Sequence, residues 1–363
     1  MTQHPTKTTI IAFTISLFVF LLSIQFFLHQ NPKMASSSAL NQTPIHPDPD
    51  PIDPYQRAHI IPNPNGTITR LHEFFPTVPP SLSNSSSLSL SKDVPLNPEK
   101  HSWVRIFLPS GSGRPAKLPI LIFAHGGGFV LYSAASRVFH EFCSNAASRL
   151  GALVISVEYR LAPEHRLPAA YDDVLEALSW VKQGKDEWVK ERGNFSNCVL
   201  AGQSAGANIV YHAGLTASDQ VNDLQPLIIT GLILIQPFFG GVDRVGSELR
   251  MVNDPFLPLA VSDLMWKLAL PEGADRGHEF CDPKEGIGSG SKTDRVRDLG
   301  WRVAVVGCDG DPLFDRQVEF VKSLEKNSVN VKSMFVEGGH HGVFSSDPSK
   351  EREFFDFVED FFS

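Results

Sequence analysis

The segment Gly-Gln-Ser-Ala-Gly at positions 202–206 has the residue types and spacing of a nucleophilic serine. The residues that lead into it, "CVLAG", are typical of a buried strand, and "ANIVYHAGL" after it is typical of a helix. A sharp turn from a strand into a helix exposes the hydroxyl of its central serine, and it needs neighbours without bulky side chains. Ser204 is therefore predicted to attack an acyl carbon.

A serine hydroxyl needs a base, and two later clusters offer one. "CDGDPLFDR" follows the strand-like "VAVVG" and supplies Asp309, Asp311 and Asp315, while "HHGVF" follows "SMFVEGG" and supplies His340 and His341. The order serine, acid, histidine is the one that a triad on such a turn requires. The spacing leaves the choice within each cluster open, although Asp315 is better suited to starting a turn or capping a helix.

Three glycines in a row follow an earlier strand-like run, in "LIFAHGGGF". Glycine gives a core nothing to pack, but it lets backbone N–H groups approach a ligand closely. Gly126, Gly127 and Gly128 are therefore predicted to donate hydrogen bonds to the oxyanion of an acyl-transfer reaction, together with the N–H of Ala205. His125 is expected to shape this loop and not to take part in catalysis.

The elements that must position these groups alternate between strand and helix from residue 119 onward. Uniformly apolar strands that alternate with helices predict an α/β fold with a mostly parallel sheet covered on both faces. The expected strands lie near 119–125, 152–159, 198–202, 229–236, 301–307 and 331–339. The expected helices lie near 136–150, 171–183, 207–215, 316–327 and 349–362.

Composition divides the chain into three parts. Residues 1–30 contain an uncharged apolar stretch at 10–28, residues 31–56 form a Pro-rich arm, and residues 57–363 form the folded domain. A second Pro- and Ser-rich segment, 76–99, is expected to be an exposed connection between strands near 68–74 and 103–108. Residues 242–300 interrupt the alternation and are expected to be an insertion above the sheet.

The apolar stretch at 10–28 leaves three interpretations open. It has the length of a signal anchor or of a long signal peptide, and it could equally be an extension that the functional protein lacks, because Met34 is a second candidate start. Membrane contact is expected only through these residues. Without them the protein would be cytoplasmic, and with them it would be anchored or secreted, so the localisation stays open.

Charge and cysteine content exclude several classes of function. The 363 residues carry a formal net charge of −8, which disfavours a nucleic-acid-binding surface. Four cysteines are widely spaced, form no C-x-x-C pair and are expected to be buried or incidental thiols. No metal site and no cofactor is predicted. The oligomeric state is not predicted.

Taken together, the motifs "HGGGF", "SVEYRLAPEHRLPAAYDD", "GQSAGAN", "GDPLFDR" and "GGHHGVF" resemble those of plant carboxylesterases of the hormone-sensitive-lipase-like α/β-hydrolase group. The resemblance covers roughly residues 54–363. It implies the α/β-hydrolase fold, with a cap built from residues 54–75 and 242–275. Within the long motif, Arg160 and Glu164 are expected to pair with each other and to support the loop beneath the oxyanion strand.

Carried over by position, the resemblance places the nucleophile on Ser204, the acid on Asp311 and the base on His341, with His340 as the alternative base. It implies a serine esterase that hydrolyses small carboxylic esters through an acyl-enzyme, without a cofactor. Two other functions on the same scaffold are kept as alternatives. One is a dehydratase or other lyase, and the other is a non-catalytic receptor for a small hormone, whose relatives lose the catalytic histidine.

Overall fold

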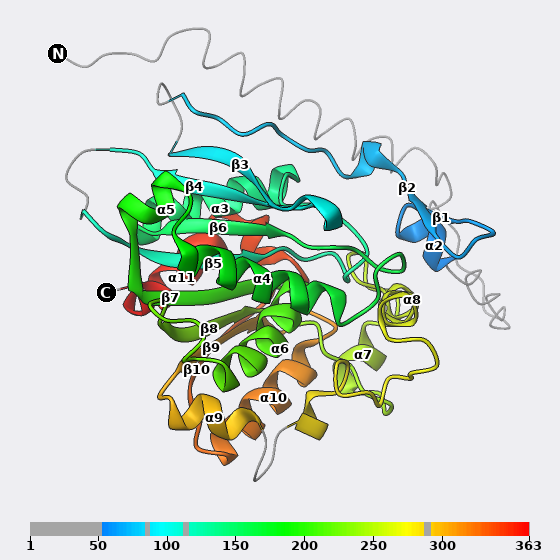
Figure 1. Cartoon of the computed structure of the whole chain (residues 1–363). Helices are drawn as coiled ribbons and strands as arrows, with labels where there is room; N and C mark the ends of the chain where they lie inside the picture. The colour runs from blue at the N-terminus through cyan, green and yellow to red at the C-terminus, as the bar shows by residue number, and fades with distance from the viewer. Residues whose placement is uncertain (1–52, 84–87, 112–115, 287–291, 363) are drawn as a thin grey trace, which may run out of the picture. The chain divides into compact units, whose positions relative to one another are not determined.

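Eight strands form the central sheet of the protein, which we describe from a computed structural model over residues 53–83, 88–111, 116–286 and 292–362 (Figure 1). The strand order is β10-β9-β8-β7-β5-β6-β4-β3. Only the pairings β3–β4 and β4–β6 are antiparallel, and the other five are parallel. The strands are β3 (Ser89–Asn97), β4 (Ser102–Pro109), β5 (Leu118–Ala124), β6 (Leu153–Glu158), β7 (Gly193–Gln203), β8 (Ile229–Ile235), β9 (Arg302–Cys308) and β10 (Asn330–Val336).

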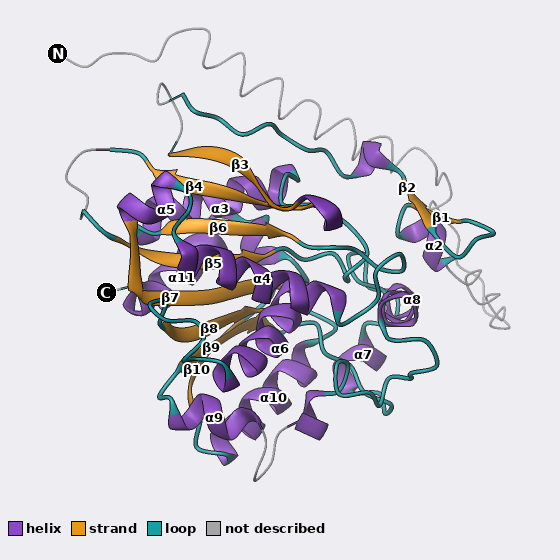
Figure 2. Ribbon diagram, viewed as in Figure 1, coloured by secondary structure: helices purple, strands orange, loops and turns teal. Residues whose placement is uncertain are grey.

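Helices cover both faces of this sheet, which confirms the predicted α/β architecture (Figure 2). On one face lie α4 (Ala169–Gln183), α6 (Ala205–Asp219) and α10 (Phe314–Lys326), and on the other lie α3 (Arg137–Leu150) and α11 (Pro348–Val358). The shorter helices are α2 (Pro54–Arg57), α5 (Glu187–Arg192), α7 (Gly246–Arg250), α8 (Leu259–Ala269) and α9 (Lys292–Asp298). Short 3₁₀ turns occupy His72–Phe74, Pro98–Lys100, Pro283–Gly286, Val343–Ser345 and Glu359–Phe361.

The apolar pattern of the strands explains why the sheet is buried on both faces. Val104 and Ile106 of β4 and Ile120 and Ile122 of β5 are fully buried on the face of α4 and α6. Phe123 of β5 lies on the opposite face among the aromatic rings of α3 and α11. The carboxyl ends of the parallel strands therefore meet at one edge, where the loops with the predicted site residues begin.

The early part of the chain differs from the prediction in two places. Residues 89–97, expected to be part of an exposed connection, form the edge strand β3. The prediction missed this strand because the Ser- and Pro-rich composition conceals the alternation of its buried and exposed side chains. Pro95 is tolerated there since an edge strand has one side free of ladder hydrogen bonds. Helix α2 begins at Pro54, within the segment 31–56 expected to be an arm, and it is capped by the side chain of Asp53.

The expected strand near 68–74 is shorter than predicted. Strand β2 (Ile68–Arg70) pairs with β1 (Ile60–Pro62), and a 3₁₀ turn follows it. The four cysteines are free and buried, as predicted. Within the described ranges no helix has the length and apolar character needed to cross a bilayer. The apolar stretch at 10–28 and most of the 31–56 arm lie outside the described residues.

Phe142 of α3 is predicted to be a main support of the aromatic layer beneath the sheet. Its ring is 2% exposed and contacts those of Phe123, Phe354 and Phe355. Phe142→Ala should lower the free energy of unfolding by about 3–5 kcal/mol, measured by urea denaturation, because it removes buried apolar surface and leaves a cavity. The matched control Leu82→Ala, at a side chain that is 70% exposed, should change it by less than about 0.5 kcal/mol. Equal losses in the two variants would contradict this assignment.

Candidate active site

Ser204 stands at the sharp turn between β7 and α6, as the sequence motif predicted. Its φ and ψ are 55° and −120°, a backbone region that residues other than glycine rarely occupy. The end of β8 holds this turn, since Ser204 N donates to the carbonyl of Ile235 at 2.8 Å and Phe238 N donates to the carbonyl of Ser204 at 3.0 Å. Gly206 is required because a Cβ there would lie 2.0 Å from the carbonyl oxygen of Ala124.

A continuous chain of hydrogen bonds joins Ser204, His341 and Asp311. The Ser204 hydroxyl lies 2.8 Å from Nε2 of His341, and Nδ1 of the same ring lies 2.9 Å from Oδ2 of Asp311. Asp311 is fully buried, and Ser204 is 7% exposed. An imidazole with its proton on Nδ1 donates to the carboxylate and accepts from the hydroxyl, which is the arrangement that deprotonates a serine.

Two glutamines that the sequence analysis missed hold the Asp311 carboxylate. Gln236 Nε2 donates to Oδ2 at 2.8 Å, and Gln317 Nε2 donates to the same oxygen at 3.0 Å. The Gln236 amide also accepts from Gly342 N at 2.8 Å, so it ties the acid loop to the histidine loop. No motif marks these residues. The only signal is the place of Gln236 directly after β8, at the same sheet edge as Ser204.

The other candidates in the two clusters have different partners. Asp309 accepts from Gly338 N, and Asp315 accepts from Ser247 N. Asp315 was expected to start a turn or cap a helix. It lies in the first turn of α10, but its side chain accepts from α7 and does not cap its own helix. His340 Nδ1 donates to the His341 carbonyl at 2.9 Å, and the His340 ring stacks on Phe256 with centroids 3.7 Å apart. The structure therefore brings His341, and not His340, to the serine.

The glycine loop approaches Ser204 from the end of β5. Gly127 and Gly128 have φ values of 114° and 62°, and a Cβ on Gly128 would lie 2.6 Å from Cγ of Met265. A side chain at either position would collide with its neighbours or strain the backbone, which explains why the motif has glycine there. Ala205 opens α6, so its N–H has no acceptor within the helix. Gly126, Gly127, Gly128 and Ser204 line one cavity.

His125 supports the glycine loop through its contact with the Gly126 carbonyl. It is fully buried, its Nδ1 lies 2.8 Å from the Gly126 carbonyl, and its ring stacks on Tyr159. The Tyr159 hydroxyl donates to the His125 carbonyl at 2.8 Å. Burial lowers the pKa of His125 to about 4, against a smaller opposing effect of the Gly126 carbonyl, because the charged ring would lose its hydration. His125 is therefore a neutral structural residue at pH 7.

The "EYRLAPEH" segment supports the site differently from the prediction. Arg160 pairs with the buried Asp173 of α4 at 2.8 Å, and Glu164 pairs with Arg70 of β2 at 2.7 Å, so the expected pairing of Arg160 with Glu164 is wrong. Glu158 accepts hydrogen bonds from Ser133 and Ala134 in the loop after the glycines. Burial raises the pKa of Glu158 to about 7, although both donors oppose the shift.

The cavity at Ser204 has a volume of about 300 Å³ and a largely apolar wall. Phe256, Leu257, Val261 and Met265 of the predicted 242–275 cap line it, and so does Phe238 after β8. Among the described residues that line it, none is Asp, Glu, Lys or Arg, and none comes from 54–75. Within the described ranges no group of three potential metal ligands is present. The wall suits an uncharged molecule of modest size.

Comparison with known proteins shows which family and which solved structures this chain is similar to. Residues 121–345 match the model of the α/β-hydrolase fold family. Carboxylesterase 20 of Arabidopsis thaliana is 46% identical, over 86% of this chain and 98% of its own length. A 3-O-acetylpapaveroxine carboxylesterase of Papaver somniferum is 44% identical, over 85% and 97%. The hyperthermophilic esterase of Pyrobaculum calidifontis, at 23% identity and a TM-score of 0.63 over 74% of this chain and 84% of its own, shares the fold.

The depressed pKa of His125 predicts a loss of stability in acid. A histidine whose pKa is about 4 when folded and 6.5 when unfolded stabilises the fold fully above pH 6.5, and this stabilisation is lost as the pH falls toward 4. The difference in unfolding free energy between the wild type and His125→Asn should therefore shrink between pH 7 and pH 5.

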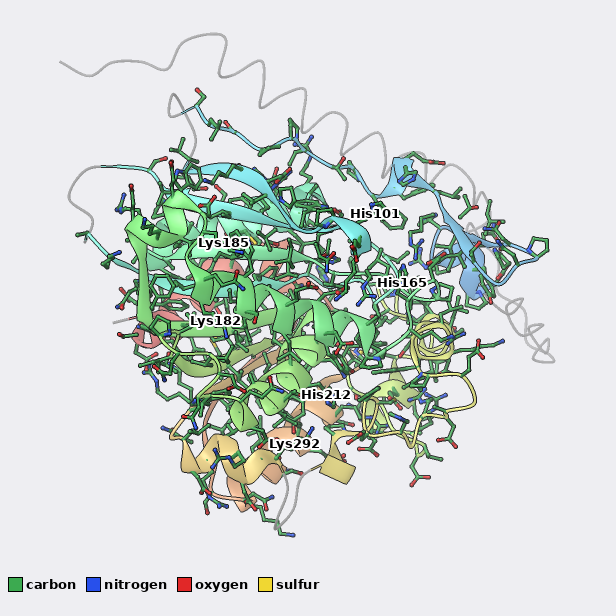
Figure 3. All side chains as sticks on the ribbon, in the orientation of Figure 1. His101, His165, Lys182, Lys185, His212 and Lys292 are labelled. Carbon is green, nitrogen blue, oxygen red and sulfur yellow. The ribbon has the colours of Figure 1, made fainter. Side chains whose placement is uncertain are left out.

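The control for this measurement is His101→Asn. His101 is exposed, and asparagine tolerates its left-handed backbone at φ 54° (Figure 3). The shrinkage for His125→Asn should exceed any change that His101→Asn shows over the same pH range. A constant difference for His125→Asn would show that His125 does not resist protonation in the folded state.

Proposed function

Because this chain belongs to the α/β-hydrolase fold family and, within it, to the plant carboxylesterases, we propose that its carboxylic ester hydrolysis runs through Ser204, His341 and Asp311. The observation that carries the proposal is the unbroken chain of hydrogen bonds from Ser204 Oγ through both ring nitrogens of His341 to Asp311. His340 is the weaker choice for the base, since its Nδ1 lies at the His341 carbonyl and its Nε2 lies 3.4 Å from Ser346 Oγ.

In this mechanism the Ser204 oxygen attacks the ester carbonyl while His341 Nε2 takes the hydroxyl proton. Asp311 stabilises the imidazolium that forms and holds the ring in its productive orientation. The tetrahedral intermediate collapses as its bond to the alcohol oxygen breaks, and His341 returns the proton to the departing alcohol. A water molecule then attacks the acyl-enzyme with the same base, which releases the carboxylic acid and restores Ser204.

The N–H groups of Gly126, Gly127, Gly128 and Ala205 are proposed to stabilise the oxyanion. Support comes from their common place beside Ser204 and from the absence of side chains where the backbone meets the cavity. Donors fixed before the reaction cost no reorganisation when charge develops on the carbonyl oxygen, which is why such a loop accelerates the reaction.

The cavity favours uncharged esters with a small apolar group, because its wall offers no charged partner to an ionised substrate. We further propose that residues 57–363, extended at the start by α2 from Pro54, are one catalytic domain whose cap comprises 54–75 and 242–275. The second part lines the cavity, and the first packs behind it, where Arg57 donates to the Pro255 carbonyl. The Papaver relative is named for an acetyl ester, a small acyl group that suits a cavity of this size.

Replacing the triad residues tests the assignment of the base. Ser204→Ala and His341→Ala should each lower kcat for p-nitrophenyl acetate by roughly 10⁴-fold or more, because nucleophile and base act as a unit. The control His340→Ala should keep kcat within about fivefold, since His340 does not reach Ser204. A reversed pattern, with His340→Ala inactive and His341→Ala active, would move the base to His340.

The same variants separate the remaining functions. A fluorophosphonate should label the wild type, and peptide mapping should place the label on Ser204, as a hydrolase requires. A receptor without catalysis would hydrolyse the ester no faster than Ser204→Ala. A lyase would release water from its substrate instead of consuming it, which mass spectrometry of the products detects.

Gly128→Ala tests the oxyanion loop. The new methyl group would meet Met265 and strain a backbone with φ of 62°, so the N–H should move away from the oxyanion. We expect kcat to fall roughly 10²–10³-fold. The control Gly300→Ala introduces alanine at a similar φ of 69° with nothing within 4 Å. It should cost about 1–2 kcal/mol of stability and leave kcat unchanged. Unchanged kcat in Gly128→Ala would remove this residue from the oxyanion site.

A further inference from the structure

We infer that Ser247, on the cap helix α7, is a positioning residue that holds the Asp311 carboxylate in line with His341. This inference rests on the proposed catalytic role of Asp311. Ser247 is fully buried and does not line the cavity, so it acts on the reaction only through the acid loop, which we define as residues 311–315.

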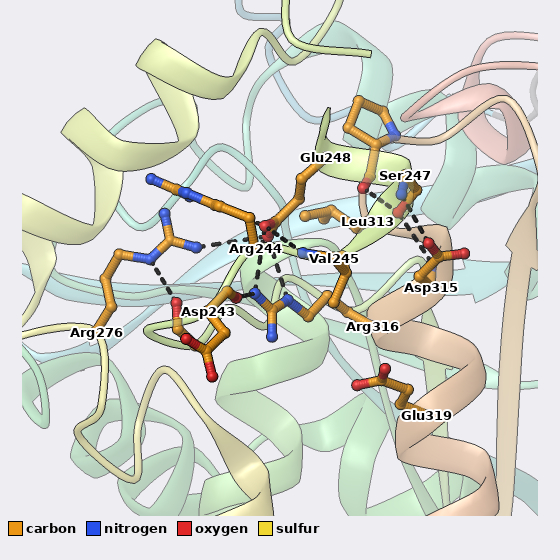
Figure 4. A network of polar contacts seen from close by, with 12 residues as sticks. Asp243, Arg244, Val245, Ser247, Glu248, Arg276, Leu313, Asp315, Arg316 and Glu319 are labelled. Carbon is orange, nitrogen blue, oxygen red and sulfur yellow. Dashed lines mark hydrogen bonds and ion pairs between the residues drawn. The ribbon is translucent and has the colours of Figure 1, made fainter. Parts of the chain in front are cut away.

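Ser247 makes three hydrogen bonds to the acid loop (Figure 4). Its hydroxyl donates to the carbonyl of Pro312, the residue after Asp311, at 2.8 Å. The same oxygen accepts from Asp315 N at 3.1 Å, and Ser247 N donates to Oδ2 of Asp315 at 2.7 Å. One serine therefore joins both ends of the segment that follows the catalytic carboxylate.

The first turn of α10 connects this contact to the carboxylate. Three consecutive side chains leave the turn in different directions. Asp315 reaches Ser247, Arg316 reaches Glu248, and Gln317 reaches Oδ2 of Asp311. Because a helical turn moves as a unit, a shift of its contacts with α7 also shifts the Gln317 donor and the Asp311 backbone.

Ion pairs keep α7 in place against this turn. The buried Glu248 accepts from Arg316 at 3.2 Å through each of its oxygens and from Arg276 at 3.4 Å (Figure 4). Arg316 also donates to the carbonyl of Asp243, at the start of the cap segment 242–275. Buried charges with several donors resist displacement strongly, since any movement leaves a charge without its partner. Ser247 is thus presented to the acid loop from a rigid support.

Ser247 differs from an ordinary buried serine in one predicted property: the effect of its removal on kcat should depend on whether Asp311 is present. If Ser247 acts by positioning that carboxylate, its loss matters only while the carboxylate is present. Removing both side chains should then cost no more than removing Asp311 alone, which is non-additive behaviour of the kind that marks coupled residues.

The experiment is a double-mutant cycle in the full chain with p-nitrophenyl acetate. Ser247→Ala should lower kcat about tenfold and leave KM within about twofold, because displacement of a catalytic group by less than an ångström is costly. In the Asp311→Asn background, the same change should alter the residual kcat by less than about twofold. Asp315→Ala removes the hydrogen bond from Ser247 N to the Asp315 carboxylate and should have the same effect on kcat and KM. Because this side chain is more exposed, Asp315→Ala takes the place of Ser247→Ala if the latter fails to fold.

The matched control is Ser218→Ala. Ser218 is also fully buried and donates one hydrogen bond, to Leu215 at the far end of α6, with no contact to the acid loop. It should cost stability but leave kcat unchanged. An unchanged kcat in Ser247→Ala, or an equal loss with and without Asp311, would overturn the inference. Full activity in Asp311→Asn itself would instead overturn the proposed triad.

Discussion

The backbone of Ser204 is the constraint on which the site depends. Holding a serine at φ 55° and ψ −120° costs about 1–3 kcal/mol, and the surrounding structure has to enforce it. Hydrogen bonds from the end of β8 hold both the N–H and the carbonyl of this residue, while Gly206 lets α6 press against the end of β5. The turn therefore exists only where three neighbouring strands of one sheet end together.

The loop after β8 extends the same constraint to the rest of the triad. Gln236 follows the strand directly, with a φ of 45°, and its backbone N–H donates to Val306 of β9. Its side-chain amide then joins the Asp311 carboxylate to the loop of His341. Residues that are far apart in the chain are thus positioned by one short segment.

The sequence predicted the nucleophile and the glycine loop because both are local. Their chemistry requires small residues at fixed distances along the chain from the end of a strand, and the sequence shows this spacing directly. The acid and the base were harder, since Asp309, Asp311 and Asp315 all follow the same strand. What separates them is the direction of each side chain, and that depends on partners such as Gly338 and Ser247.

Long-range pairs account for the other differences. Arg160 was expected to pair with Glu164 inside the same motif, but the chain after β6 does not continue as a helix, and the two side chains find partners elsewhere. Arg160 reaches the buried Asp173 instead, and Glu164 reaches Arg70. Strand β3 escaped prediction for a related reason, because an edge strand needs little apolar character and its partner β4 supplies most of the burial.

Two contacts join the proposed cap segment 242–275 to the proposed catalytic loops, and they bear on how far substrate choice and catalysis are separable. Met265 packs on Gly128 of the oxyanion loop, and Ser247 holds the acid loop. A side chain that narrows the cavity at 256–265 therefore lies on the same segment that supports both loops. Enlarging the cavity at Met265 would also remove a support of the proposed oxyanion loop, whereas Leu257 and Val261 line the same cavity and are not among the atoms nearest to Gly126, Gly127 or Gly128. Leu257 and Val261 also belong to the buried core, so hydrophobic substitutions of similar volume at these two positions should change substrate choice at the least cost to the fold.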